Sequence, residues 1–177
     1  MKTLYLIKHA KSDWSVPGES DMERDITKKG LKHINTMGSY LTLRGVNPDV
    51  ILSSCALRAQ ETSNILAEKI NFSGPKYFLQ ELYLSPPELI KEIIIAQDDE
   101  HSEMFIVGHN PQLSELVFML SGEHIAKMPS LAIVAIKFDI QEWSELEDKQ
   151  GEIDFFISPK QFKYYMPKQI RVTLKVD

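Results

Sequence analysis

Three short segments of the sequence hold side chains that could bind or attack a phosphate. They contain Lys8, His9, Lys11 and Ser12 in the first, Arg58 in the second, and His109 and Asn110 in the third. Arginine presents a planar fork of N–H donors to phosphate oxygens, and histidine can donate hydrogen bonds or attack phosphorus as a nucleophile. A doubly charged oxyanion such as phosphate is therefore the natural ligand, provided that the fold brings the three segments together.

The first and third segments directly follow apolar runs. Arg58 lies in the first turn of a helical segment, which itself comes just after another apolar run. The pattern predicts buried strands at residues 3–7, 49–52 and 104–107. In open α/β sheets, ligands bind beyond the carboxyl ends of the strands. Two histidines and several cations are thus expected to face one crevice.

The rest of the chain alternates in the same way between strand and helix signals. Weaker or later strands are expected at 76–79, 131–138, 153–157 and 171–176, and helices at about 27–43, 56–70, 87–96 and 113–120. Residues 15–23 are expected to form a loop because they combine Pro17 and Gly18 with several acids. No helix is evident among the later strands. This order predicts βα units that build a largely parallel sheet.

Composition limits the classes of protein that need consideration. The 177 residues suit a single domain, residues 1–177, and 43% hydrophobic and 25% charged residues are ordinary for a soluble protein. A net charge of −5 argues against broad nucleic-acid binding, and no run approaches the ~18 apolar residues that span a bilayer. The single cysteine, Cys55, excludes an internal disulfide, and the short N-terminal apolar run does not suit a secretory signal. A cytoplasmic location without membrane attachment is therefore expected.

The sequence also resembles a known family. Residues 4–14 resemble the opening of SixA-type phosphohistidine phosphatases in the histidine phosphatase superfamily, and residues 53–62 resemble the family's second arginine motif. Further similarity lies at Arg24, Thr27, Gly30, Leu82, Tyr83, 108–111, Trp143, Gly151 and 158–160. The resemblance covers about residues 3–162 and leaves 163–177 as a C-terminal extension. It implies a three-layer, phosphoglycerate mutase-like fold with helices on both faces of the sheet.

The resemblance also implies roles for individual residues. His9 would be the nucleophile that forms a phosphohistidine intermediate, while Arg58 and protonated His109 would hold the phosphoryl group, without metal or cofactor. Lys8 departs from the family, which usually has arginine there; lysine keeps the charge but loses the bidentate fork. Lys11, Ser12 and Asn110 are additional candidates for phosphate binding.

The proton donor for the leaving group is a separate question. Glu81 follows the weak third strand and directly precedes Leu82 and Tyr83, which makes it the best-placed carboxylate in the sequence. Asp13 is a poorer candidate.

Three functions remain open at this point. The first is a phosphatase for phosphohistidine in a protein, such as a histidine-phosphorylated signalling domain, because SixA-like chains lack the long insertions that enclose small substrates. The second is a phosphatase for small phosphoesters or another phosphoprotein. The third is a phosphate-binding module in which Lys8 has weakened or abolished catalysis.

Overall fold

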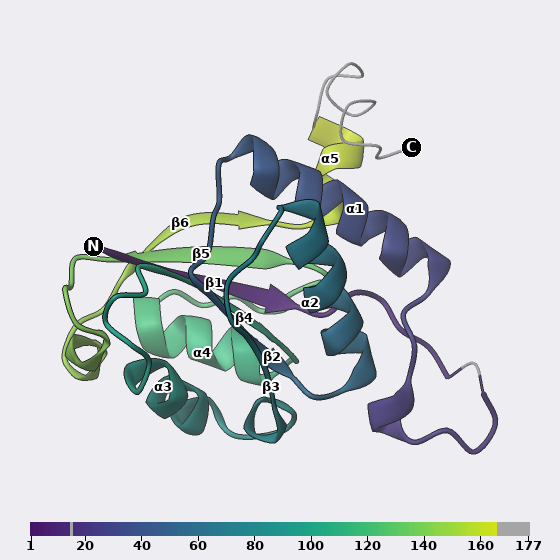
Figure 1. Ribbon diagram of the computed structural model, residues 1–177, viewed down its shortest axis with the longest axis horizontal. Helices are drawn as coiled ribbons and strands as arrows, with labels where there is room; N and C mark the ends of the chain where they lie inside the picture. The colour runs from purple at the N-terminus through teal and green to yellow at the C-terminus, as the bar shows by residue number, and fades with distance from the viewer. Residues whose placement is uncertain (15, 166–177) are drawn as a thin grey trace.

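A six-stranded mixed sheet organises the chain, whose computed structural model describes residues 1–14 and 16–165 (Figure 1). The strand order is β3-β2-β4-β1-β5-β6. The strands are β1 (Lys2–Lys8), β2 (Val50–Ser54), β3 (Lys76–Leu79), β4 (Glu103–Gly108), β5 (Ile133–Phe138) and β6 (Glu152–Ile157). The first four strands pair in parallel, whereas β5 and β6 pair antiparallel. The expected, mostly parallel α/β sheet is confirmed.

Helices cover both faces of this sheet, which gives the expected three layers (Figure 1). The α-helices are α1 (Lys28–Leu43), α2 (Leu57–Lys69), α3 (Pro87–Ile95), α4 (Gln112–Ser121) and α5 (Pro159–Tyr165); the 3-10 helices are η1 (Asp21–Glu23), η2 (Gln80–Leu82) and η3 (Trp143–Glu147). α1, α2 and α5 lie on one face, and α3 and α4 lie on the other. No helix in the described ranges is both long and apolar enough to cross a membrane.

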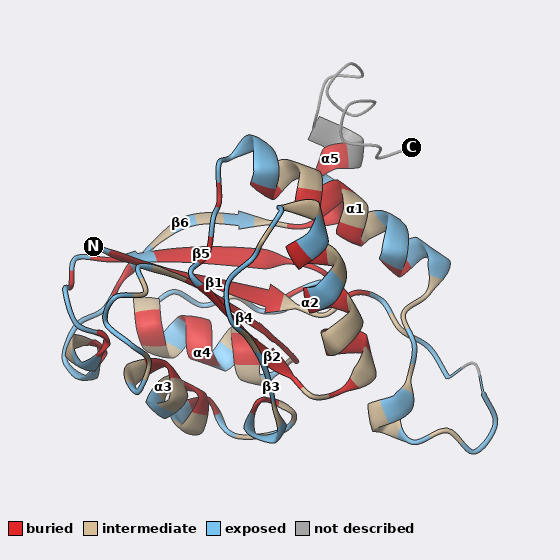
Figure 2. Cartoon of the chain, viewed as in Figure 1, coloured by how far each residue is buried: buried red, intermediate tan, exposed pale blue. Residues whose placement is uncertain are grey.

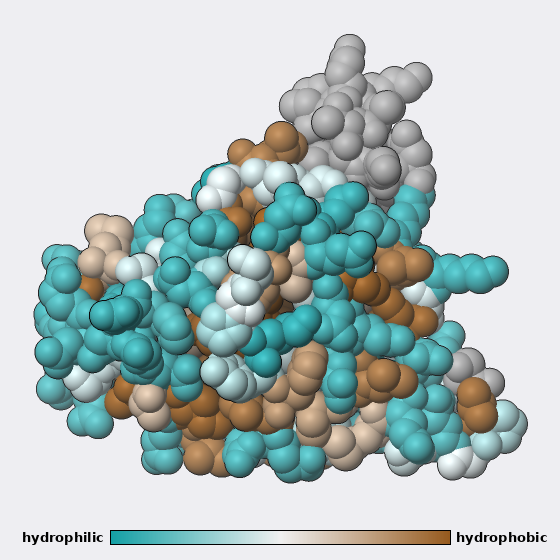
Figure 3. All heavy atoms as spheres, viewed as in Figure 1, coloured by the Kyte–Doolittle hydropathy of each residue, from teal (hydrophilic) through white to brown (hydrophobic). Residues whose placement is uncertain are grey.

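Alternation along the central strands builds one core on each face. In β1, Leu4 and Leu6 belong to the cluster under α3 and α4, whereas Tyr5 and Ile7 belong to the cluster under α1 and α2. Successive strand side chains point to opposite faces, so a strand covered on both sides is apolar throughout. Figure 2 shows the resulting buried band through β1, β4 and β5. On the face drawn in Figure 3, hydrophobic side chains also reach the surface over α3.

The register of the central strands sets the position of the two histidines. Lys8 of β1 pairs with Gly108 of β4, and the His9 amide donates to the Gly108 carbonyl over 3.1 Å. The His9 carbonyl accepts from the Leu131 amide on the other side. His9 and His109 therefore leave neighbouring strands at the same level.

Most expected elements agree with the structure to within two residues, and the differences are local. The strand expected from 131 begins at Ile133, because Leu131 has a φ of 56° and breaks the extended conformation. Two short helices, η3 and α5, lie where none was evident. α5 is anchored by Phe162, which is fully buried and meets Tyr40 of α1 edge-on at 5.2 Å between ring centroids. The strand expected at 171–176 lies outside the described residues.

Candidate active site

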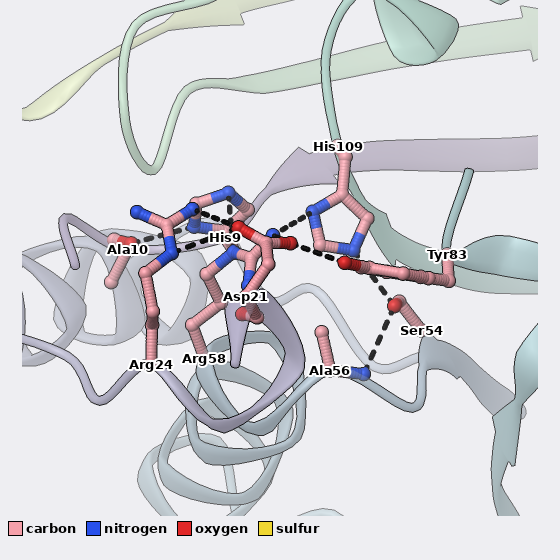
Figure 4. A network of polar contacts seen from close by, with 9 residues as sticks. All are labelled: His9, Ala10, Asp21, Arg24, Ser54, Ala56, Arg58, Tyr83 and His109. Carbon is pink, nitrogen blue, oxygen red and sulfur yellow. Dashed lines mark hydrogen bonds and ion pairs between the residues drawn. The ribbon is translucent and has the colours of Figure 1, made fainter. Parts of the chain in front are cut away.

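The side chains of His9, Arg58 and His109 meet beyond the carboxyl ends of β1, β2 and β4 (Figure 4). The two imidazole rings lie 5.0 Å apart between centroids, and Arg58 reaches both from the first turn of α2. Arg58 and His109 are buried, with 3% and 5% of their surface exposed. The sequence-based expectation that three strand exits share one crevice agrees with this geometry.

Hydrogen bonds fix the tautomer of His9. Its Nδ1 lies 2.7 Å from the carbonyl oxygen of Ala10, which can only accept, so Nδ1 carries the proton. Nε2 then keeps its lone pair and accepts from Nε of Arg58 over 3.3 Å. Burial lowers the pKa of His9 to about 4, and the charges of Arg58, Lys8 and Arg24 act in the same direction, against the hydrogen bond to Ala10. At neutral pH His9 is an uncharged imidazole with an available lone pair on Nε2.

His109 is held neutral by similar means. Its Nδ1 lies 3.4 Å from Nη2 of Arg58, which can only donate, and its Nε2 lies 2.7 Å from Oγ of Ser54. Nε2 therefore carries the proton and donates it to Ser54, whose oxygen also accepts from the Ala56 amide. Burial, followed by the nearby His9 and Arg58, lowers the pKa of His109 to about 3. The protonated His109 expected from the sequence is not the form in this structure; a bound dianion would raise its pKa.

The guanidinium of Arg58 also holds an anion of the chain itself. Nη1 donates to the main-chain oxygen of Asp21 over 2.5 Å, and Nη2 donates to its carboxylate over 3.0 Å. The same carboxylate accepts from Nε of Arg24 over 3.0 Å and from the hydroxyl of Tyr83. Partial burial opposes ionisation of Asp21, but the hydrogen bonds from Tyr83 and Arg58 and the two guanidinium charges outweigh it and lower its pKa. Donors suited to a phosphoryl group therefore surround an internal carboxylate.

Comparison with known proteins relates part of this chain to a family. Residues 4–82 match the model of the histidine phosphatase superfamily, branch 1. The similarity to this family lies in the part of the chain that contains His9 and Arg58. An uncharacterized protein of Mycobacterium leprae is 25% identical over 166 residues, which cover 87% of this chain and 100% of that protein.

Solved structures of several phosphatases share the fold. The protein histidine phosphatase SixA complexed with tungstate superposes with a TM-score of 0.80 at 21% identity, covering 90% of this chain and 99% of that one. A protein named as phosphohistidine phosphatase SixA from Agrobacterium tumefaciens gives 0.78 at 24% identity, covering 89% and 98%. A mycobacterial glucosyl-3-phosphoglycerate phosphatase gives 0.63 at 13% identity, covering 86% and 97%.

In this chain, the carboxylate beside the histidines is Asp21 and not one of the expected acids. Glu81 lies in η2, is exposed, and has no hydrogen bond or ion pair within the described part of the chain. It lies near the thiol of Cys55, whose pKa burial and the Glu81 charge both raise. Asp13 is exposed as well. Tyr83, two residues after Glu81, reaches the site instead.

The remaining expected phosphate ligands lie around the site and outside its hydrogen-bond network. Lys11 is exposed, and Ser12 forms an isolated strand bridge with Ile26. Asn110 donates to the main-chain oxygen of Met128 over 2.9 Å, so it anchors the loop before β5. Lys8 is half-buried beside a groove that adjoins the site.

Sequence patterns hardly predict that Asp21 lies in the site together with Arg24 and Tyr83. Arg24 and Tyr83 belong to segments that resemble the superfamily, but their convergence on one carboxylate depends on the path of a long loop. Asp21 has one local signal, its i,i+3 spacing from Arg24, which suits the observed 3.0 Å ion pair. Across residues 1–14 and 16–165, no cluster of three or more His, Cys, Asp or Glu side chains could hold a metal ion.

Proposed function

We propose that this protein is a phosphatase that takes the phosphoryl group of a phosphohistidine in a protein onto Nε2 of His9 and then transfers it to water. The observation that carries this proposal is the hydrogen-bond geometry of His9: Nδ1 lies 2.7 Å from the Ala10 carbonyl oxygen, and Nε2 lies 3.3 Å from Nε of the buried Arg58. A neutral imidazole beside fixed cations combines a nucleophile with charges that attract its anionic target.

Binding comes first and requires an exchange of anions. The substrate phosphoryl group displaces the Asp21 carboxylate from Arg58 and Arg24 and accepts hydrogen bonds from their N–H groups. His109 then faces a dianion, which raises its pKa and favours a protonated form that also donates to phosphoryl oxygens. His109 would thus become the protonated phosphoryl ligand expected from the sequence only when the substrate binds.

Transfer then forms a bond from Nε2 of His9 to phosphorus and breaks the bond from phosphorus to the substrate nitrogen. A substrate phosphohistidine that is protonated on its second ring nitrogen leaves as neutral imidazole, so this step needs no further acid. The Nδ1–H of His9 keeps its hydrogen bond to Ala10 and stabilises the cationic phosphorylated ring. Arg58 and Arg24 balance charge on the nonbridging oxygens.

Hydrolysis returns the enzyme to its starting form. Water attacks phosphorus, the bond to Nε2 breaks, and His9 leaves as the neutral Nδ1–H tautomer while phosphate keeps the protons of the water. A phosphoester substrate would need a proton for its alkoxide. Glu81 remains the predicted donor for that case, and Asp21 is the acid within the hydrogen-bond network.

The test compares substrates on the wild-type chain and on His9→Ala. A protein carrying phosphohistidine and a panel of sugar phosphates are each incubated with both proteins, and released phosphate is measured. We expect wild-type turnover to favour the phosphohistidine protein, and His9→Ala to release none. Equal release by His9→Ala would contradict the proposal. The proposed setting is the cytoplasm, where a phosphorylated signalling protein would be the partner.

Two other functions are outcomes of the same assay. A small-molecule phosphatase is favoured by the shared fold of the mycobacterial glucosyl-3-phosphoglycerate phosphatase, and preference for the sugar phosphates would select it. A phosphate-binding module is favoured by Lys8, which cannot form the bidentate contact of an arginine. Binding of the phosphoprotein without release, together with activity gained by Lys8→Arg, would select that function.

A further inference from the structure

A groove of about 1160 Å³ adjoins the candidate active site on the face that carries α3 and α4. Its floor is the exposed side of α4, and its walls are the start of α3 at residues 86–88 and the loop at residues 124–127. Small-molecule sites typically have volumes of roughly 300–1,000 Å³, so this groove is large for a compact metabolite. Its size suits a stretch of polypeptide.

The end of the groove next to His9 is cationic. Lys8, which precedes His9, lines this end together with Asn110 and Lys127. Asn110 fixes the approach of the loop through its 2.9 Å hydrogen bond to Met128. Among the contacts of the described residues, neither lysine has a hydrogen-bond or ion-pair partner. Two lysines without an ion-pair partner among the described residues thus line the groove, and one of them directly precedes the nucleophile.

Further along α4 the groove becomes apolar. Phe118, Met119 and Ile125 line it, and the ring of Phe118 stacks on His124 with 4.0 Å between centroids. Phe118 is 45% exposed, which leaves much of a large aromatic ring uncovered. Aromatic side chains in such grooves are common anchors of protein interfaces.

Two acids also line the groove. Glu115 projects from α4, and Glu88 lies in the first turn of α3. Both are exposed, and within residues 1–14 and 16–165 neither forms an ion pair. The groove therefore carries lysines beside His9, acids in the first turns of α3 and α4, and apolar side chains further along α4.

We infer that this groove binds the polypeptide segment next to the phosphorylated residue of a protein substrate, with an apolar side chain against Phe118 and a basic side chain between Glu88 and Glu115. The inference deepens the proposed function and rests on it. Charge complementarity selects the occupant, because a chain with a phosphoryl group beside the lysines and with basic and apolar side chains next to it matches the three kinds of lining residue.

Helix geometry sets the spacing of that segment. Phe118 lies seven residues beyond Pro111 on α4, which is about 10 Å at ~1.5 Å per helical residue. An extended peptide covers this length in about three residues at ~3.3–3.6 Å each. The apolar and basic side chains are therefore expected within about three residues of the phosphorylated one.

The test uses peptides that carry phosphohistidine and differ only in their flank. One peptide has an apolar and a lysine residue within three positions, the other has glycine and glutamate there, and a small phosphoramidate serves as a flank-free substrate. Kinetics are measured for the wild-type chain, Phe118→Ala and Glu115→Lys. Leu43→Ala and Glu68→Lys are matched controls, because both residues are exposed on the opposite face of the sheet.

Phe118→Ala is expected to raise KM for the apolar–basic peptide about tenfold with kcat unchanged, as for loss of an interface anchor. Glu115→Lys is expected to reverse the preference between the two flanks. Phosphoramidate hydrolysis should be the same in all five proteins. If wild type turned over phosphoramidate but the groove variants matched their controls, the inference would fail while the proposed function stood.

Other results would overturn one of the two claims separately. If wild type hydrolysed neither phosphoramidate nor peptide, the proposed function itself would fail. If Phe118→Ala instead converted a dimer into a monomer in light scattering without changing peptide KM, a second copy of the chain would be the occupant of the groove, and the peptide inference would be wrong.

Discussion

The carboxylate of Asp21 lies 3.0 Å from Nη2 of Arg58 and occupies donors that the proposed mechanism assigns to the phosphoryl group. Arg58 also donates to the main-chain oxygen of Asp21, and Arg24 and Tyr83 complete the shell around the carboxylate. A substrate must therefore compete with an anion of the chain itself. The hydrogen-bond donors and the neutral His9 are already in place for a phosphoryl group. The Asp21 carboxylate, however, occupies those donors.

This competition predicts that removing the Asp21 charge strengthens anion binding. Asp21→Asn keeps the size of the side chain but no longer pairs with Arg58 and Arg24, so we expect tungstate, a tetrahedral oxyanion, to bind several-fold more tightly. Isothermal titration calorimetry measures the change in Kd. Asp13→Asn, an exposed carboxylate outside the network, is the control. Weaker tungstate binding by Asp21→Asn would show that the carboxylate supports the anion site.

Replacement of Arg58 tests whether catalysis needs its bidentate guanidinium or only its positive charge. Arg58→Lys keeps one positive charge but cannot contact His9, His109 and an anion together. We expect kcat on a phosphohistidine protein to fall by about 10²–10³-fold, the range found when a transition-state donor is removed. Circular dichroism should show an unchanged fold. A variant with nearly normal kcat would exclude Arg58 from the reacting centre.

Lys8 supplies a positive charge beside His9 but lacks the bidentate guanidinium of an arginine. Its ammonium lies at the junction of the groove and the site, and burial, followed by the charge of Lys127, lowers its pKa. We expect Lys8→Met to reduce kcat/KM by about tenfold, since one charge that favours an anionic transition state is lost. Lys8→Arg should retain activity, and Lys11→Met, at an exposed position, should have no effect. Activity that appears only in Lys8→Arg would instead favour the binding-module function.

The two neutral histidines make the fold sensitive to acid. Their pKa values of about 4 and about 3 lie below the ordinary 6.5, so the unfolded chain takes up protons that the folded chain does not between those limits. Stability is therefore greatest above pH 6.5 and falls as the pH decreases. From pH 6.5 to 5 we expect each histidine to cost roughly 2 kcal/mol of unfolding free energy.

Urea unfolding of the wild-type chain and of the double variant His9→Gln/His109→Gln between pH 7 and 4.5 measures this dependence. The double variant should lose distinctly less stability over that range, because glutamine does not titrate. Parallel curves for the two proteins would mean that the histidines are not held neutral in the folded state.

Much of the site was predictable because its central residues follow directly from strand positions. His9 and His109 end up together since β1 and β4 pair in parallel with Lys8 opposite Gly108, and Arg58 follows from the short connection between β2 and α2. Hydrophobic runs encode these placements strongly, because both faces of the sheet are buried.

Features that depend on loop paths or on protonation were not predictable in the same way. Asp21 reaches Arg58 across 37 residues of sequence through a loop with no periodic signal. Glu81 turns outward in η2 although its position after β3 suggested an acid in the site. The neutral state of His109 results from burial next to Arg58 and His9, which sequence spacing does not reveal.

The central claim is that Nε2 of His9 carries the phosphoryl group between substrate and water. The most direct measurement is rapid acid-free quenching of the reaction with a phosphohistidine protein, followed by intact-mass and peptide mass spectrometry of the wild-type chain and His9→Ala. The account predicts one transient phosphoryl group on the peptide that contains His9, stable in alkali and lost in acid, and none in His9→Ala. A phosphoryl group on another residue, or turnover without any phosphorylated enzyme, would contradict it.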